Sequence, residues 1–438
     1  MLSTFLLSIC CCIAFTIAAQ TLGSVSTSAN VKCQCYVVSG PEPDYFQYYR
    51  FWDFRAVPFD SASLKNFNFY PHINNITTTV HGSLSANSVP SKSILLKDTP
   101  FANDWNIQNW HHKGTDLFPV TTVNSNQNVF ITKSHLRGDS TYLVLRTTRN
   151  ENYSSTAEIE SSVRNIFHCS LRVRFRLMSN DELIHSPPLG EEIPGQMHIQ
   201  TIPQTPQPAS LVRRNARRNP PPTGACAGIF TFNSTVSESD IEILTSDPHN
   251  RVHYANQPDY DYATDEVIDG ASIVKDIPVP WTSWATHRLD WFPGASRWYV
   301  NNQLQAMNTY GVPVDPSRLI INLWSNGGVW SGNLTVGESV YMGIEFIELA
   351  YNVSGAYPVY RKSQHSSGRL AVDRLNHTEH HNEGEPLRAN ASSKAMIASD
   401  VGATKSRACK VGCQIDNVRH DGIPEVLWGF SDVVIPGY

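Results

Sequence analysis

Three carboxyl side chains occupy every second position from 238 to 242. In a β-strand, Glu238, Asp240 and Glu242 would form a row on one face, because successive side chains of a strand point to opposite faces. Ile241 and Ile243 would then face the other way, and their β-branched side chains favour a strand. We therefore expect a strand that presents three acids together.

A pair of carboxyl groups beside a scissile bond is what acetal hydrolysis requires, since one protonates the leaving oxygen while the other attacks the sugar carbon or stabilises its cation. Retention of configuration needs the two groups roughly 5 to 5.5 Å apart, whereas Cα atoms four residues apart in a strand are separated by about 13 Å. Glu238 and Glu242 would therefore lean toward each other over Asp240. Asp240 could share a proton with one glutamate and raise the pKa of the other, so the two could differ in protonation near neutral pH. The alternative is an amphipathic strand whose acids simply face water.

Aromatic and glycine-containing segments accompany the acid row in a definite order along the chain. They are FWDFR at 51–55, WNIQNW at 105–110, GACAG at 224–228, ESDIE at 238–242, DWFPG at 290–294, WYV at 298–300 and NLW at 322–324. In content and order these segments resemble the family 16 glycoside hydrolases, and most of all their secreted fungal members, over roughly residues 45 to 355. That family commonly has an aliphatic residue at the position of Ser239. Because this side chain would face the core, the departure concerns packing more than chemistry.

The resemblance implies retaining hydrolysis of O-glycosidic bonds in β-glucan or a related polysaccharide. By position in the motif, Glu238 is the expected nucleophile, Asp240 its electrostatic helper and Glu242 the acid/base. A cell-wall transglycosylase, which passes the covalent intermediate to another sugar, and a lectin, which binds sugar without cutting it, are alternative hypotheses. The sequence lacks the signatures of serine hydrolases, P-loop proteins and zinc proteases, and we expect neither a cofactor nor a metal.

Five residues are candidates for substrate binding. In the resembled family the strand after the acids contributes polar and aromatic groups to the sugar cleft, which makes His253 and Tyr254 candidates, although a core histidine or a surface tyrosine is an equal alternative. Asn322 and Trp324 share one face of a strand and carry the family's cleft pattern, and sugars need amide partners for hydroxyls and indole for the apolar ring face. Trp330 lies in a Gly-rich loop, where an aromatic ring has little to bury against, and is a second stacking candidate.

Strand patterns dominate residues 45 to 180, where apolar and polar residues alternate between turn residues. Helical periodicity is scarce, and strands without βαβ spacing favour a sandwich or jelly roll. Together with the resemblance, this predicts an all-β fold: a two-sheet antiparallel β-sandwich of the concanavalin A-like type with a disordered insertion and tail. Most of the tryptophans at 281, 284, 291 and 298 are expected in its core.

The chain ends carry their own signals. An apolar run at 6–19 that ends in small residues predicts a signal peptide at 1–20, with a signal anchor as the alternative. The rest divides into the β-sandwich hydrolase domain at 33–358, a flexible linker at 359–407 and a short Cys-containing segment at 408–438. Within the domain, the Pro- and Gln-rich stretch 180–222 predicts a disordered insertion or an error in the gene model. The paired arginines in this stretch suggest two further hypotheses, that it is a site of proteolytic processing or that it binds an anionic polymer.

Six cysteines remain once those at 10–12 leave with the signal peptide: Cys33, Cys35, Cys169, Cys226, Cys409 and Cys413. An even number suits an oxidising compartment. We expect the first two to join the last two, which ties the chain ends together, and the middle two to bridge strands. A zinc site formed by the terminal four is the alternative.

Charge and glycosylation motifs indicate the environment and the partner. A net charge of -5 and a pI of about 6.3 give no electrostatic case for nucleic acid or an anionic membrane, so a neutral polysaccharide is the expected partner and a monomer the expected state. With the signal peptide removed, no membrane segment is expected, and the protein is predicted to be secreted, either extracellular or associated with the cell wall. Glycosylation motifs begin at Asn75, Asn152, Asn233, Asn333, Asn352, Asn376 and Asn390.

Overall fold

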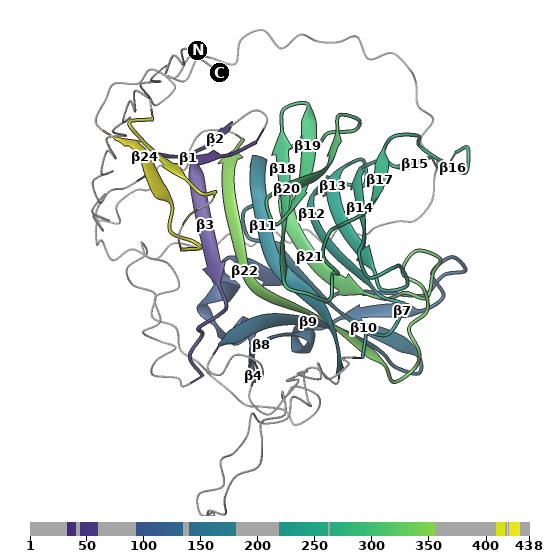
Figure 1. The fold of residues 1–438 in the computed structure, drawn as a ribbon. Coiled ribbons are helices and arrows are strands. Elements are labelled where there is room, and N and C mark those ends of the chain that lie inside the picture. The colour runs from purple at the N-terminus through teal and green to yellow at the C-terminus, as the bar shows by residue number, and fades with distance from the viewer. Residues whose placement is uncertain are drawn as a thin grey trace, which may run out of the picture.

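The computed structural model describes residues 33–40, 44–59, 93–134, 140–180, 219–261, 263–354, 409–416, 418 and 420–429. These residues form two layers of curved β-sheet around one apolar core, as the strand patterns predicted (Figure 1). The predicted signal peptide, the linker at 359–407 and most of the insertion at 180–222 lie outside the described residues. Among the residues that are described, no helix combines the length and apolar composition needed to cross a bilayer.

One layer, here called the cleft sheet, carries the acid row. Its strands in spatial order are β5 (Trp105–Ile107), β10 (Tyr153–Ser161), β21 (Arg318–Trp324), β12 (Cys226–Ser234), β13 (Ser237–Leu244), β14 (Arg251–Asn256) and β17 (Ser272–Asp276), all antiparallel to their neighbours. The start of β10 also pairs in parallel with β7 (Thr121–Asn124), which pairs with β6 (His111–His112). The short helices η1 (Leu96–Asp98), η2 (Pro100–Asn103) and η3 (Asn126–Asn128) connect strands.

The second layer, the outer sheet, backs the cleft sheet. It runs β4 (Ser93–Leu95), β8 (Val129–Lys133), β9 (Thr141–Arg149), β22 (Ser339–Val353), β11 (Ile166–Ser179), β18 (Ala285–Phe292), β19 (Ala295–Val300) and β20 (Gln303–Asn308), with β3 (Tyr48–Asp53) also paired to β22. The small hairpin β15 (Tyr260–Asp261) and β16 (Glu266–Val267) projects beside β17.

Side chains that alternate inward from both sheets fill the core. Trp281, Trp291 and Trp298 are fully buried there, as expected, while Trp284 is partly buried against a smaller cluster around Tyr142. Burying a large apolar side chain stabilises a fold by about 1.5–3 kcal/mol, so these indoles fix how the two sheets pack. The cleft sheet therefore has one face committed to the core and one face open for chemistry.

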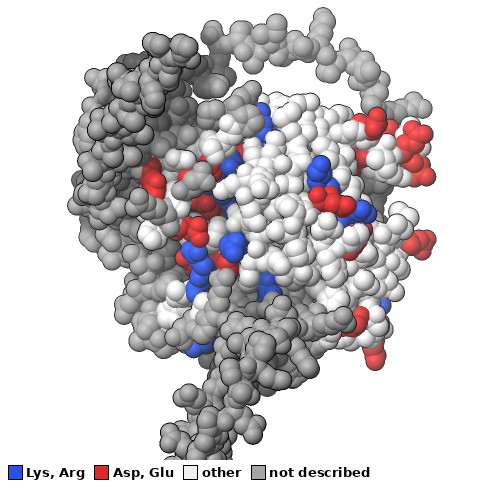
Figure 2. All heavy atoms as spheres, in the orientation of Figure 1, with Lys and Arg blue, Asp and Glu red and all other residues white. Residues whose placement is uncertain are grey.

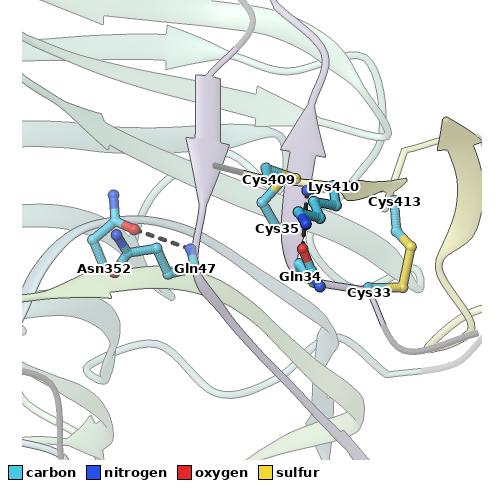
Figure 3. The surroundings of a disulfide bond; sticks show 8 residues. All are labelled: Cys33, Gln34, Cys35, Gln47, Asn352, Cys409, Lys410 and Cys413. Atoms are coloured by element: carbon cyan, nitrogen blue, oxygen red, sulfur yellow. Dashed lines mark hydrogen bonds between the residues drawn. A yellow bond between two sulfur atoms is a disulfide. The ribbon is translucent and has the colours of Figure 1, made fainter. Parts of the chain in front are cut away.

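The first and last strands of the described residues form a separate four-stranded sheet against the outer sheet, here called the terminal clasp. Its order is β2 (Asp44–Phe46), β1 (Cys35–Val38), β23 (Val411–Gln414) and β24 (Glu425–Gly429), so purple and yellow strands lie side by side in Figure 1. The disulfides Cys33–Cys413 and Cys35–Cys409 hold this sheet together, as predicted (Figure 3). Because all four sulfur atoms are in disulfides, they do not form the alternative zinc site. Asp416, 3% exposed, receives hydrogen bonds from Arg172 and Arg288 of the outer sheet.

The predicted disulfide between Cys169 and Cys226 is wrong, since both thiols are free and buried. Cys169 lies on β11 of the outer sheet, inside the core. Cys226 lies on β12 of the cleft sheet, where its sulfur reaches Glu242. The two side chains belong to different layers and different faces, so their Cβ atoms cannot approach as a disulfide requires.

The surface of the outer sheet mixes charges of both signs. Figure 2 shows acidic and basic side chains next to one another on this face, and the contacts include Arg174 Nε to Glu345 Oε2 at 2.6 Å. Four of the predicted glycosylation sites are described: Asn152, Asn233 and Asn333 are exposed, whereas Asn352 is half-buried and accepts a hydrogen bond from the Gln47 backbone (Figure 3). Asn75, Asn376 and Asn390 lie outside the described residues. Glycosylation stays a prediction.

Candidate active site

Strand β13 presents the acid row because its other face is apolar. Ile241 and Ile243 are buried in the core, and Ser239 on that same side donates a hydrogen bond to Ser296 Oγ at 3.1 Å. This contact places Ser239 on the packing side of the strand, as expected. The three acids therefore point to the open face, where β12 and β14 flank them on either side.

The acids differ in burial and in proton affinity. Glu238 and Glu242 are half-buried, whereas Asp240 between them is 2% exposed. Burial raises the pKa of Glu238 to about 7 and that of Glu242 to about 8, and the Asp240 charge adds to the rise for Glu242. Burial, and then the Glu238 charge, raise the pKa of Asp240 well above its ordinary value. A hydrogen bond between Glu238 and Asp240 lowers the pKa of Glu238 and raises that of Asp240.

Gln257, just past the end of β14, holds the middle of the row. Its Nε2 donates to Asp240 Oδ2 at 3.1 Å, and its backbone N–H donates to the Glu238 carbonyl at 3.0 Å. One Asp240 oxygen, Oδ2, is thereby fixed on the amide. The sequence reasoning missed Gln257, because only the pairing of β13 with β14 reveals that it lies opposite the acids.

Glu242 is enclosed by three side chains from other segments. The Cys226 thiol on β12 donates to Glu242 Oε1 at 3.4 Å, and the Trp330 indole also hydrogen-bonds to Glu242. His253 lies directly across the strand pair from Glu242, with its ring 5.0 Å from that of Trp330 and its Nε2 2.6 Å from Asp247 Oδ2. The structure thus brings two predicted binding residues, His253 and Trp330, next to the predicted acid/base.

Tyr254 is not part of this group, and the prediction that it binds substrate is wrong. It is fully buried on the core face, where its ring stacks on that of Trp298 with centroids 5.3 Å apart. Adjacent residues of a strand face opposite ways, so His253 and Tyr254 cannot both reach the cleft. Once His253 faces the acids, Tyr254 must face the core.

A cavity of about 740 Å³, a volume suited to a small ligand or a few sugar rings, opens over β10 and β21, and β12 lies between it and the acid row. Asn322 and Trp324 on β21 line it, as predicted for a sugar cleft. The other lining residues are Trp110, His112, Lys113, Thr115, Asp116, Leu117, Phe118, Val120, Thr122, Asn124, Thr156, Ala157, Glu158 and Asn326.

Gly228 has no side chain on the open face of the cleft sheet, between this cavity and the acids. In the strand register it lies between Glu242 of β13 and Asn322 of β21. A Cβ atom at Gly228 would lie 2.6 Å from Asn322 Oδ1, which is closer than atoms can pack. The missing side chain therefore leaves a continuous floor from Glu242 to Asn322 and on to Glu158 of β10.

Glu158 is a further cleft carboxyl that the sequence reasoning missed. It is 8% exposed and accepts hydrogen bonds from Trp110 Nε1 at 3.3 Å and Asn322 Nδ2 at 3.2 Å. Burial raises its pKa to about 7, despite the Asn322 hydrogen bond, which acts to lower it. A signal was present in the sequence, since acids and apolar residues alternate from Ala157 to Glu160 as they do in the acid row. Among the described residues, no cluster of three or more His, Cys, Asp or Glu side chains suits a metal ion.

Comparison with known proteins finds β-glucanases. The chain is 27% identical over 137 residues to a beta-glucanase of Paenibacillus polymyxa, covering 30% of this chain and 55% of that protein. It is 29% identical over 117 residues to a beta-glucanase of Bacillus licheniformis, covering 25% and 45%. The aligned stretches thus span about half the length of these relatives. Among solved structures, a Bacillus licheniformis beta-glucanase aligns over 60% of this chain and 94% of its own at 17% identity, with a TM-score of 0.38. No family model matches the sequence.

Proposed function

We propose that this protein is a retaining glycoside hydrolase of the family 16 type that cleaves O-glycosidic bonds within β-glucan or a related polysaccharide. The observation that carries the proposal is the row of three carboxyl groups on the open face of the cleft sheet, which continues over Gly228 to a cavity lined by indole and amide groups. Burial raises the pKa of Glu238 to about 7 and that of Glu242 to about 8, so both titrate near neutral pH. Retaining hydrolysis needs one of the pair ionised as nucleophile and the other protonated as acid. The similarity to curated beta-glucanases supports the same substrate class.

In the first step, the Glu238 carboxylate attacks C1 of the sugar as Glu242 gives its proton to the leaving glycosidic oxygen. The bond from C1 to the leaving oxygen breaks, and a covalent glycosyl ester forms on Glu238. In the second step, ionised Glu242 takes a proton from water, which attacks C1 and releases Glu238. The hydrogen bond between Asp240 and Glu238 lowers the pKa of Glu238, which favours the carboxylate before attack and after release.

Substrate contacts are assigned by chemistry. The Trp324 indole offers an apolar ring face for stacking, while Asn322 and Glu158 offer amide and carboxyl groups to sugar hydroxyls. Trp330, 39% exposed, covers the other side of Glu242 and can meet the sugar across the scissile bond. We further propose that the protein acts outside the cell, since its two disulfides suit an oxidising compartment.

The test is digestion of laminarin, mixed-linkage glucan, chitin and galactan by the wild-type protein and by Glu238→Gln. We expect release of reducing ends from at least one β-glucan and loss of nearly all of it in the variant. Asp276→Asn is the matched control, because this acid is exposed on β17 and pairs with Arg251. Binding of glucan with no cleavage would instead identify a lectin, and transfer to a labelled acceptor oligosaccharide would identify a transglycosylase.

A further inference from the structure

A free thiol lies under the proposed acid/base. Cys226 is fully buried on β12, and its strand neighbours are Leu244 of β13 and Trp324 of β21. It shares the cleft-facing side of β12 with Gly228, two residues along the strand. Its sulfur is bonded to no other cysteine, so the thiol hydrogen is available for a hydrogen bond.

That hydrogen bond goes to Glu242. The distance from Cys226 Sγ to Glu242 Oε1 is 3.4 Å, which is normal for a sulfur donor. Burial raises the pKa of Cys226 well above its ordinary value, and the nearby Glu242 charge raises it further. Cys226 therefore stays a neutral thiol wherever the enzyme operates, and it acts as a hydrogen-bond donor and not as a nucleophile.

We propose that Cys226 is a positioning residue for Glu242. The Cys226 thiol holds Oε1 of Glu242, so that Oε2 of Glu242 faces the glycosidic oxygen of the substrate. This inference rests on the proposed function, in which Glu242 passes a proton to and from the substrate. A carboxyl held at one oxygen keeps its proton on the other, and this fixes the direction of transfer. The Trp330 hydrogen bond approaches from the loop, so donors from two separate segments hold the same side chain.

Several other titratable groups surround Glu242. They are Asp240 and Glu238 on its own strand, Asp259 beyond β14, His253 on β14 with its partner Asp247, and Glu158 across Gly228 and Asn322. Burial and the Asp240 and Asp259 charges raise the Glu242 pKa, whereas the Cys226 and Trp330 hydrogen bonds lower it. Loss of the thiol donor should therefore raise the Glu242 pKa further.

The experiment compares Cys226→Ser with Cys226→Ala. Serine and alanine are close in size, so the difference between the two variants isolates the donor from the small loss of volume. For Cys226→Ala on a soluble β-glucan, we expect kcat to fall about fivefold to tenfold with little change in KM, as the loss of one weak hydrogen bond to a charged group predicts. The basic limb of its kcat/KM profile should move up by about half to one pH unit. Cys226→Ser should restore most of both.

Cys169 supplies the control, because it is equally buried but lies on the outer sheet away from the acids. Cys169→Ala and Cys169→Ser should lower the melting temperature without moving the pH profile. A basic limb that stays in place in Cys226→Ala, or that moves equally in Cys226→Ser or Cys169→Ala, would overturn the proposal.

A measurement that needs no activity separates this inference from the proposed function. Infrared difference spectra across a pH titration report the protonated carboxyl band of Glu242, assigned as the band missing in Glu242→Gln. We expect its titration to move to higher pH in Cys226→Ala and to stay close to wild type in Cys226→Ser. An unchanged titration overturns the positioning role even in an active enzyme. A protein inactive on every glucan that still shows the shift refutes the proposed function alone.

Discussion

The buried carboxyl of Glu158 should make the protein less stable as the pH rises. Its pKa is raised from 4.5 to about 7, so the folded state holds the proton more tightly than the unfolded chain does. Stability therefore falls as the pH rises from about 4.5 to about 7 and is level above that range. The rise from 4.5 to about 7, at about 1.4 kcal/mol per pH unit, corresponds to roughly 3 kcal/mol.

Glu158→Gln removes this titration and keeps the shape of the side chain. The new carbonyl can accept from Trp110 Nε1. The new amide replaces Oε2, which accepts from Asn322 Nδ2, so the Asn322 amide must flip to present Oδ1, an atom without a hydrogen-bond partner in the described structure. We expect the variant to match the wild type near pH 4 and to gain about 1.4 kcal/mol per pH unit between about 4.5 and 7. At pH 8 the gain should approach about 3 kcal/mol.

Urea unfolding at a series of pH values from about 4 to 8 measures this difference. Glu160→Gln is the matched control, since Glu160 lies two residues along β10 and its carboxylate pairs with Arg318 at 3.1 Å. That substitution should give no such gain. If the stability difference for Glu158→Gln is constant with pH, packing and not ionisation of Glu158 is responsible for it, and the predicted linkage is wrong. The same variant should bind glucan more weakly if the carboxyl contacts sugar.

Three further predictions concern activity and the terminal clasp. The pH profile of kcat/KM should be bell-shaped with limbs near pH 7 and 8, because activity needs ionised Glu238 and protonated Glu242. Initial rates measured across pH check this. A kcat/KM that levels off at both low and high pH would contradict it. Trp324→Ala should raise KM about tenfold with kcat nearly unchanged, since ring stacking binds substrate and transition state alike; an unchanged KM would remove Trp324 from the binding site. Asp416→Asn should lower stability by about 3 kcal/mol in urea unfolding, because it removes a buried carboxylate partner of Arg288; a loss below about 1 kcal/mol would show that the clasp docks without this pair.

The sequence was sufficient where the controlling pattern is local. The alternation of acids and isoleucines in β13 depends only on strand geometry, and the structure arranges that strand as the alternation requires. The pairing of terminal cysteines followed from an even count and from their position at the two ends. The tryptophans of the core were predictable because large apolar side chains in strands must be covered.

The sequence was insufficient where contacts join distant segments. Glu158 and Asn322 are 164 residues apart, and only the pairing of β10 with β21 brings them together. The error at Cys169 and Cys226 has the same origin, since counting cysteines cannot tell which layer of a sandwich each occupies. Tyr254 was a different kind of error, because strand alternation already places it opposite His253.

The most direct test of the central claim is covalent trapping of the glycosyl intermediate. A β-glucan oligosaccharide with fluorine at C2 and an activated leaving group slows hydrolysis of the ester and allows mass spectrometry of the peptides. We expect one added glycosyl unit per chain, on a peptide that contains Glu238, and no addition in Glu238→Gln. Turnover of the activated substrate without any adduct, or an adduct on another residue, would contradict it.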